Sequence, residues 1–83
     1  MPHGPGVDNE ITRRVRRELN RRSVDCSKVQ VKVSYGVIYL SGELKGNRGF
    51  MGNLKDELEI IHNILMHIPG AREIVDRDLR LMK

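Results

Sequence analysis

The sequence contains one cysteine, one phenylalanine and no tryptophan, and only 4% of its 83 residues are aromatic. A single cysteine excludes a disulfide within the chain and favours a reducing compartment. Because aromatic residues are scarce, the core must consist of valine, isoleucine, leucine and methionine. No apolar stretch approaches the roughly 20 residues of a membrane-spanning helix. A chain of 83 residues is expected to form one small domain, and a single cysteine leaves that domain without an internal disulfide.

Residues 1–7 are rich in proline and glycine and contain no apolar segment typical of a signal peptide. We expect them to form a disordered lead, followed by a single domain over residues 8–82. On this sequence alone we expect a cytoplasmic location. An envelope or periplasmic location is expected instead if the chain is a domain cut from a longer protein.

The positive charge of the chain is concentrated in residues 10–22. This segment holds six arginines and two glutamates, whereas the other nine basic and nine acidic residues cancel, so it carries the whole net charge of +4. Its residues Ile11, Val15 and Leu19 recur every four positions, which predicts a helix with a narrow apolar stripe that ends near residue 22. Asp8 is a candidate N-cap, and Glu10–Arg14 and Glu18–Arg22 are candidate ion pairs.

The basic side of this helix is the main candidate for a binding surface. Opposite the apolar stripe, a helical wheel groups Arg13, Arg14, Arg17 and Arg21. A guanidinium group offers several donors in a plane and so suits phosphate recognition. The alternative is an ordinary solvated face in which glutamates balance the arginines.

Residues 28–44 show the pattern of a β-hairpin. Apolar and polar residues alternate over residues 29–33, and Tyr35-Gly36 occupies the expected turn, where glycine accommodates a positive φ. On the return strand, one face carries Ile38, Leu40 and Leu44. The other face carries Tyr39, which is expected to be exposed.

The second half of the chain predicts a helix and a third strand. A glycine-rich loop over residues 45–53 ends at Asn53, a candidate cap for a helix over residues 54–67. Pro69-Gly70 ends that helix, and a strand follows over residues 72–81, with a bulge or an edge position expected at Arg77. The order αββαβ predicts an α/β fold of the α+β sandwich type. We expect three strands with both helices on one face, and the third strand parallel to the second and beside the first.

These elements resemble the BON domain family, a small bacterial binding module, over almost the whole chain. Residues 35–42, Tyr-Gly-Val-Ile-Tyr-Leu-Ser-Gly, are similar to the family's n-G-v-V-t-L-s-G, and residues 68–76 are similar to its v-P-G-V-x-x-V-x-N. The resemblance assigns structural turns to Gly36, Gly42 and Gly70. It implies no catalysis, and a role in binding phospholipid membranes or partner proteins. The arginine-rich helix and the three-glycine loop depart from the family pattern.

The loop adds further candidate ligand-binding residues, namely Lys45, Arg48 and Phe50. Its Gly-Asn-Arg-Gly sequence also resembles the Gly-x-x-Gly loop that KH domains use on nucleic acid, although it follows a strand instead of a helix. Phe50 has two interpretations: an apolar anchor for a membrane or partner, or a residue that closes one end of the core.

The sequence shows no nucleophile constellation, phosphate-binding loop or metal-ligand cluster. Glu59 and His62 lack the second pair that helical metal sites require. We therefore expect a non-catalytic module with no metal or cofactor, which docks on anionic phospholipid or a partner protein through the basic helix. The alternatives are a nucleic-acid-binding domain that uses the same arginines and a structural domain that forms homo-oligomers.

Overall fold

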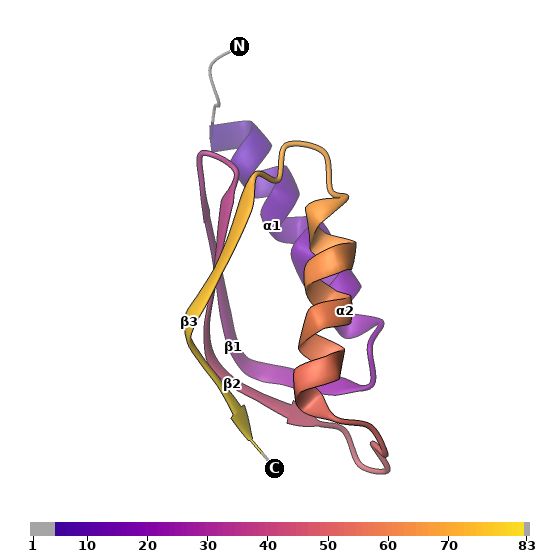
Figure 1. The fold of residues 1–83 in the computed structure, drawn as a ribbon. Helices are drawn as coiled ribbons and strands as arrows, with labels where there is room; N and C mark the ends of the chain where they lie inside the picture. Colours follow the sequence, from indigo (N-terminus) through magenta and orange to yellow (C-terminus); the bar gives the residue numbers. More distant parts are fainter. Residues whose placement is uncertain (1–4, 83) are drawn as a thin grey trace.

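The computed structural model describes residues 5–82. The elements in order are α1 (Pro5–Asn20), β1 (Val24–Ser34), β2 (Val37–Gly46), α2 (Leu54–Met66) and β3 (Glu73–Met82). Figure 1 shows the three strands in one sheet, with α1 and α2 against the same face. The predicted αββαβ order and the α+β sandwich are thus confirmed, and no element of residues 5–82 covers the other face of the sheet.

The strand order corrects one prediction. β1 is antiparallel to β2, and β3 is parallel to β2 as expected. However, the order in the sheet is β1-β2-β3, so the prediction that the third strand lies beside the first was wrong. Since α1 already covers β1, the place left for α2 is beside α1, and a short crossover through α2 returns the chain to the free edge of β2.

The first helix begins earlier than the sequence indicates. It starts at Pro5, in line with the preference of proline for the first turn, so residues 5–7 of the expected lead are helical. Residues 1–4, the rest of that lead, lie outside the described residues. Asp8 is therefore inside the first turn and is not the N-cap. Its carboxylate accepts hydrogen bonds from the backbone N–H groups of Tyr35 and Gly36, at 3.1 and 3.2 Å.

The hairpin is longer than predicted. β1 begins at Val24, so most of residues 23–27, which lie between the predicted helix and the predicted hairpin, are strand. A bulge between Asp25 and Lys28 hides the alternation there. The turn is the expected one, because Ser34 pairs with Val37 across two residues. Tyr35 and Gly36 both have positive φ, 50° and 81°, as the favoured two-residue hairpin turn requires.

The core lies between the helices and the sheet. The apolar stripe of α1 is buried as predicted, and residues from α2 and the strands complete a single cluster of Ile11, Val15, Leu19, Val24, Val29, Ile38, Leu40, Leu44, Ile61, Leu65 and Ile68. Asn53 caps α2 as expected, with its side chain accepting from the N–H of Lys55 at 2.7 Å. The anomaly at Arg77 is also confirmed, since the β2–β3 register shifts between Val75 and Asp78.

Candidate functional site: the basic face of α1

The outer face of α1, together with Arg21 directly after its end, presents five exposed arginines to solvent. Because Ile11, Val15 and Leu19 are at most 3% exposed, the orientation of the helix is fixed with its opposite side outward. The exposed residues on that side are Arg13, Arg14, Arg16, Arg17 and Arg21. The predicted group of four is thus on one accessible surface. Arg16 was missed, although on a helical wheel it lies as close to the centre of this face as Arg14 does.

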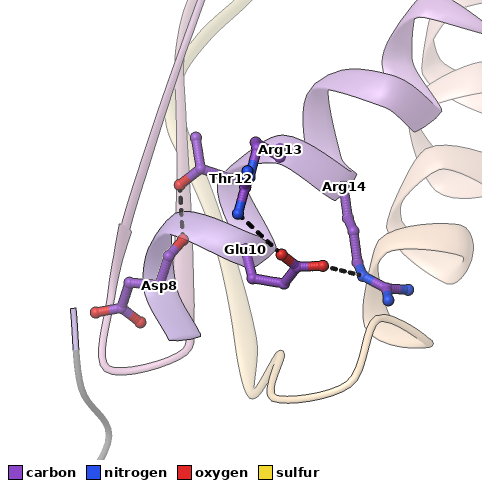
Figure 2. A network of polar contacts seen from close by, with 5 residues as sticks. All are labelled: Asp8, Glu10, Thr12, Arg13 and Arg14. Carbon is purple, nitrogen blue, oxygen red and sulfur yellow. Dashed lines mark hydrogen bonds and ion pairs between the residues drawn. The ribbon is translucent and has the colours of Figure 1, made fainter. Parts of the chain in front are cut away.

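Two glutamates balance part of this charge. Glu10 pairs with Arg13 at 3.1 Å and with Arg14 at 3.2 Å, as Figure 2 shows, so the expected Glu10–Arg14 pair is confirmed. Glu18 pairs with Arg21 at 3.2 Å instead of with Arg22. Such exposed pairs are weak and exchange easily with other anions.

Arg16 and Arg17 form no ion pair with any residue of the described chain. They are separated by one turn or less from the paired arginines on either side. Between the paired arginines, α1 therefore carries two cations that no carboxylate of residues 5–82 contacts. An external anion has these two guanidinium groups available without breaking an ion pair.

Two surface grooves run along this face, and Arg17 and Arg21 line both. One groove, of about 580 Å³, lies along α1 and is lined by Thr12, Arg13, Arg16, Arg17, Asn20 and Arg21. The other, of about 520 Å³, lies between α1 and the end of α2, and its α2 side is formed by Ile64, His67, Ile68 and Pro69. The arginines thus line two shallow, open depressions of this surface.

The loop after β2 brings Arg48 to the end of the basic face. The N–H of Asn47 donates to the carbonyl of Ser23 at 3.1 Å, which holds the loop against the α1–β1 connection. As a result, Arg21 and Arg48 line the same groove of about 530 Å³, together with Ser23 and Asn47. The sequence alone does not show this proximity, because the two arginines are separated by the whole hairpin.

Lys45 lies away from the arginines. Its neighbour Leu44 is buried under the helices, so the alternation of β2 places Lys45 on the uncovered face of the sheet. There it pairs in register with Asp25. The hydrogen bond from the Ser27 N–H is the main cause that lowers the pKa of Asp25, and Lys45 and Lys28 add smaller contributions.

Phe50 is half-buried and packs against the core, which favours the core-closing interpretation over the exposed anchor. Its ring lies against Gly46, where an added Cβ would be only 2.5 Å from Phe50 Cδ2. Gly46, the first glycine of the Gly-x-x-Gly sequence, is therefore needed because a side chain there would overlap the ring of Phe50. In contrast, the neighbouring Met51 is 95% exposed.

The ion pair between Arg22 and Glu57, which both line the groove of Arg21 and Arg48, was not predicted from the sequence. Arg22 donates to both carboxylate oxygens of Glu57, with Nη2 3.0 Å from Oε1, and these hydrogen bonds raise the pKa of Arg22. Glu57 is only 7% exposed. One feature of the sequence could have indicated a buried pair: Glu57 lies on the apolar side of the second helix, one turn before Ile61.

The two histidines within residues 5–82, His62 and His67, do not form a metal site. His62 is half-buried, and its Nε2 lies 2.8 Å from Asp76 Oδ2 on β3. His67 Nδ1 lies 2.6 Å from the carbonyl oxygen of Asn63. Within residues 5–82 there is no cluster of three ligand side chains for a metal. None of the helices described there has the length and apolar character required to cross a membrane.

Comparisons with protein-family models, with curated proteins and with solved structures find no match for this chain. The resemblance to the BON family therefore stays a prediction that rests on the sequence motifs. The function has to be argued from the charge and shape of the surface.

Proposed function

We propose that this protein is a non-catalytic binding module that docks on anionic phospholipid membranes through the basic face of α1. The observation that carries the proposal is the concentration of positive charge on this one exposed face, where five exposed arginines against Glu10 and Glu18 leave +3 of the chain's net charge of +4. Anionic bilayers attract such clusters, with about 1 kcal/mol gained for each Lys or Arg near the surface. Arg16 and Arg17, which form no ion pair within residues 5–82, add charge to this face without opening an existing pair. The resemblance to BON domains agrees with a binding role.

The test is co-sedimentation with vesicles. Vesicles of phosphatidylglycerol mixed with phosphatidylcholine are compared with vesicles of phosphatidylcholine alone, at low and at physiological salt. We expect binding to the anionic vesicles only, and weaker binding at the higher salt, because ions screen charges on exposed surfaces. Equal binding to both vesicle types, or to neither, would contradict the proposal.

A matched pair of charge-reversal variants assigns the surface. The first variant replaces Arg13, Arg17 and Arg21 with glutamate, and the control replaces Lys28, Lys32 and Arg80, which are exposed on the strands. In each variant, three reversals of two charges lower the net charge from +4 to −2. We expect the α1 variant to lose more than about 100-fold in affinity. The control should lose clearly less, and equal losses would mean that net charge alone matters.

The other functions appear as distinct outcomes of the same assays. Binding to polynucleotide with a steep salt dependence, together with indifference to lipid, would replace the proposal with nucleic-acid binding. A stable oligomer in sedimentation, indifferent to both ligands, would replace it with a structural role. Saturable binding of another protein through the same arginines, without lipid binding, would identify a protein partner.

A further inference from the structure

One end of the molecule combines apolar and basic surfaces around the β2–α2 loop. Figure 1 shows this loop, the α1–β1 connection and the end of β3 at the same end, opposite the hairpin turn. Two grooves meet there, and Asn47 and Phe50 line both of them. The loop is thus a ridge between two concave surfaces, and we call this region the loop end, defined by residues 47–55 with Arg21 and Leu81-Met82.

The groove on one side of the ridge is mainly apolar. It has a volume of about 510 Å³, and its apolar wall is formed by Phe50, Leu54, Leu81 and Met82. Leu81 is 36% exposed although it lies on the strand face that packs toward the helices. Apolar side chains of β3 are therefore left accessible where α2 begins and no longer covers the sheet.

The groove on the other side is basic. Arg21 and Arg48 line it, together with the polar groups of Ser23 and Asn47. Among the described residues that line it, the only carboxylate is that of Glu57, which is held by Arg22. Residues 45–55 carry three cations and no acidic residue. The groove therefore offers an anion the guanidinium group of Arg48, which has no ion pair within residues 5–82, and that of Arg21, whose exposed pair with Glu18 would open.

The crest of the ridge carries Met51, which is 95% exposed. A single exposed apolar residue is ordinary on a protein surface. Here, however, the residue before it is anchored in the core, so Met51 is presented outward on a fixed base, and the N–H of Phe50 donates to the Asn47 carbonyl at 2.8 Å within a tight turn. An apolar tip beside cations matches the boundary between lipid headgroups and acyl chains.

We infer that the loop end is the part of the protein that enters the bilayer, with Met51 inserted at the headgroup–acyl boundary and Arg21 and Arg48 on lipid phosphates. The apolar groove of Phe50, Leu54 and Leu81 then faces the acyl region. This inference rests on the proposed membrane docking and deepens it, since it assigns the inserted element. The basic face of α1 supplies attraction, and the loop end supplies apolar contact that salt does not screen.

The absence of tryptophan makes the test direct, because one introduced tryptophan is the only indole in the protein. Met51→Trp places it on the ridge, and Tyr39→Trp places it on the uncovered sheet face, where Tyr39 is 41% exposed. Fluorescence is measured with phosphatidylglycerol-containing vesicles, with and without brominated acyl chains. We expect a blue shift and quenching by bromine for Met51→Trp only.

A second set of variants measures the contribution to affinity. Met51→Ser removes the apolar tip, and Met66→Ser, at a 43% exposed site on α2, is the matched control. Burial of a methionine side chain predicts a loss of about tenfold in vesicle affinity for Met51→Ser. The loss should persist at high salt, while Met66→Ser binds like the wild type.

The outcomes separate this inference from the proposed function. If the wild type binds anionic vesicles but Met51→Trp shows neither shift nor quenching, the inference fails and docking through α1 stands. If both tryptophan variants respond equally, insertion is not specific to the loop end and the inference also fails. If the wild type does not bind anionic vesicles, the proposed function fails, and the inference fails with it.

Discussion

Arg22 and Glu57 form a two-point ion pair that joins the segment after α1 to the first turn of α2. The two partners are unequally buried, since the side chain of Arg22 is 31% exposed and that of Glu57 only 9%. A buried charge is tolerated only when it is paired. Glu57 therefore depends on Arg22, whereas Arg22 can reach water by itself.

This asymmetry predicts unequal effects of the two single substitutions. Arg22→Ala strands a buried carboxylate, so we expect the free energy of unfolding to fall by about 2–3 kcal/mol. Glu57→Gln keeps the volume and one acceptor, so we expect a fall of about 1 kcal/mol. Urea denaturation followed by circular dichroism measures both values.

Arg16→Ala is the control for the ion pair, because Arg16 is exposed and has no ion-pair partner in residues 5–82. We expect it to change the free energy of unfolding by less than about 0.5 kcal/mol. The explanation would be wrong if Arg22→Ala were as mild as this control. It would also be wrong if Glu57→Gln were the more destabilising member of the pair.

The contact between Asp8 and the hairpin turn predicts a second stability effect. The carboxylate accepts from the N–H groups of Tyr35 and Gly36, and Tyr35 has the unfavourable φ of 50° for a residue with a side chain. We expect Asp8→Ala to lower the free energy of unfolding by about 1–2 kcal/mol through these lost hydrogen bonds. Thermal denaturation of Asp8→Ala beside Asn9→Ala, at an exposed position, checks this. Equal stability of the two variants would refute a role for the contact.

The elements of this fold could be predicted because their signals are local. The four-residue spacing of Ile11, Val15 and Leu19 and the alternation over residues 29–33 each determine which face of an element is buried. The turn at Tyr35-Gly36 is readable for the same reason. In contrast, the sequence did not predict the start of β1. A strand is predicted from alternating apolar and polar residues, and the bulge between Asp25 and Lys28 interrupts this alternation.

The packing of the elements against one another was harder to predict from the sequence than the elements themselves. Nothing in the residues of β3 distinguishes a place beside β2 from one beside β1, since that choice depends on where α1 already lies. The same limit applies to the site. The arginines of α1 share a face that a wheel reveals, but the approach of Arg48 to Arg21 and the partner of Glu57 are created only by tertiary packing.

Gly42 and Gly49 allow a test of backbone against packing effects. Both have positive φ, 98° and 88°, but an added Cβ at Gly42 would lie 2.0 Å from the carbonyl oxygen of Lys28, whereas at Gly49 it would meet nothing within 4 Å. Gly49→Ala should cost about 1 kcal/mol of backbone strain. Gly42→Ala should cost clearly more, about 3 kcal/mol or above, because β1 must also shift. Chemical denaturation of both variants measures the loss in free energy of unfolding. Equal losses would show that β1 shifts away from the added methyl group without loss of stability.

The half-buried thiol of Cys26 predicts how stability depends on pH. Desolvation, followed by the charge of Asp25, raises the pKa of Cys26 above its ordinary value of 9.0, while Arg16 has the opposite effect. The folded thiol therefore keeps its proton at pH values where the unfolded thiol loses it. Its contribution to stability is complete below the unfolded pKa and is lost as the pH rises through the folded pKa.

We expect the free energy of unfolding of the wild type to fall more between pH 7 and pH 10 than that of Cys26→Ala, because only the wild type has this thiol. Titration of the other groups is common to both proteins and cancels in the comparison. Denaturation in the presence of a reducing agent gives the two profiles. Alkylation by iodoacetamide at pH 8 should also be slower in the folded protein than in urea, since the thiolate is the reacting species. Parallel pH profiles combined with equal alkylation rates would show that the fold does not protect this thiol.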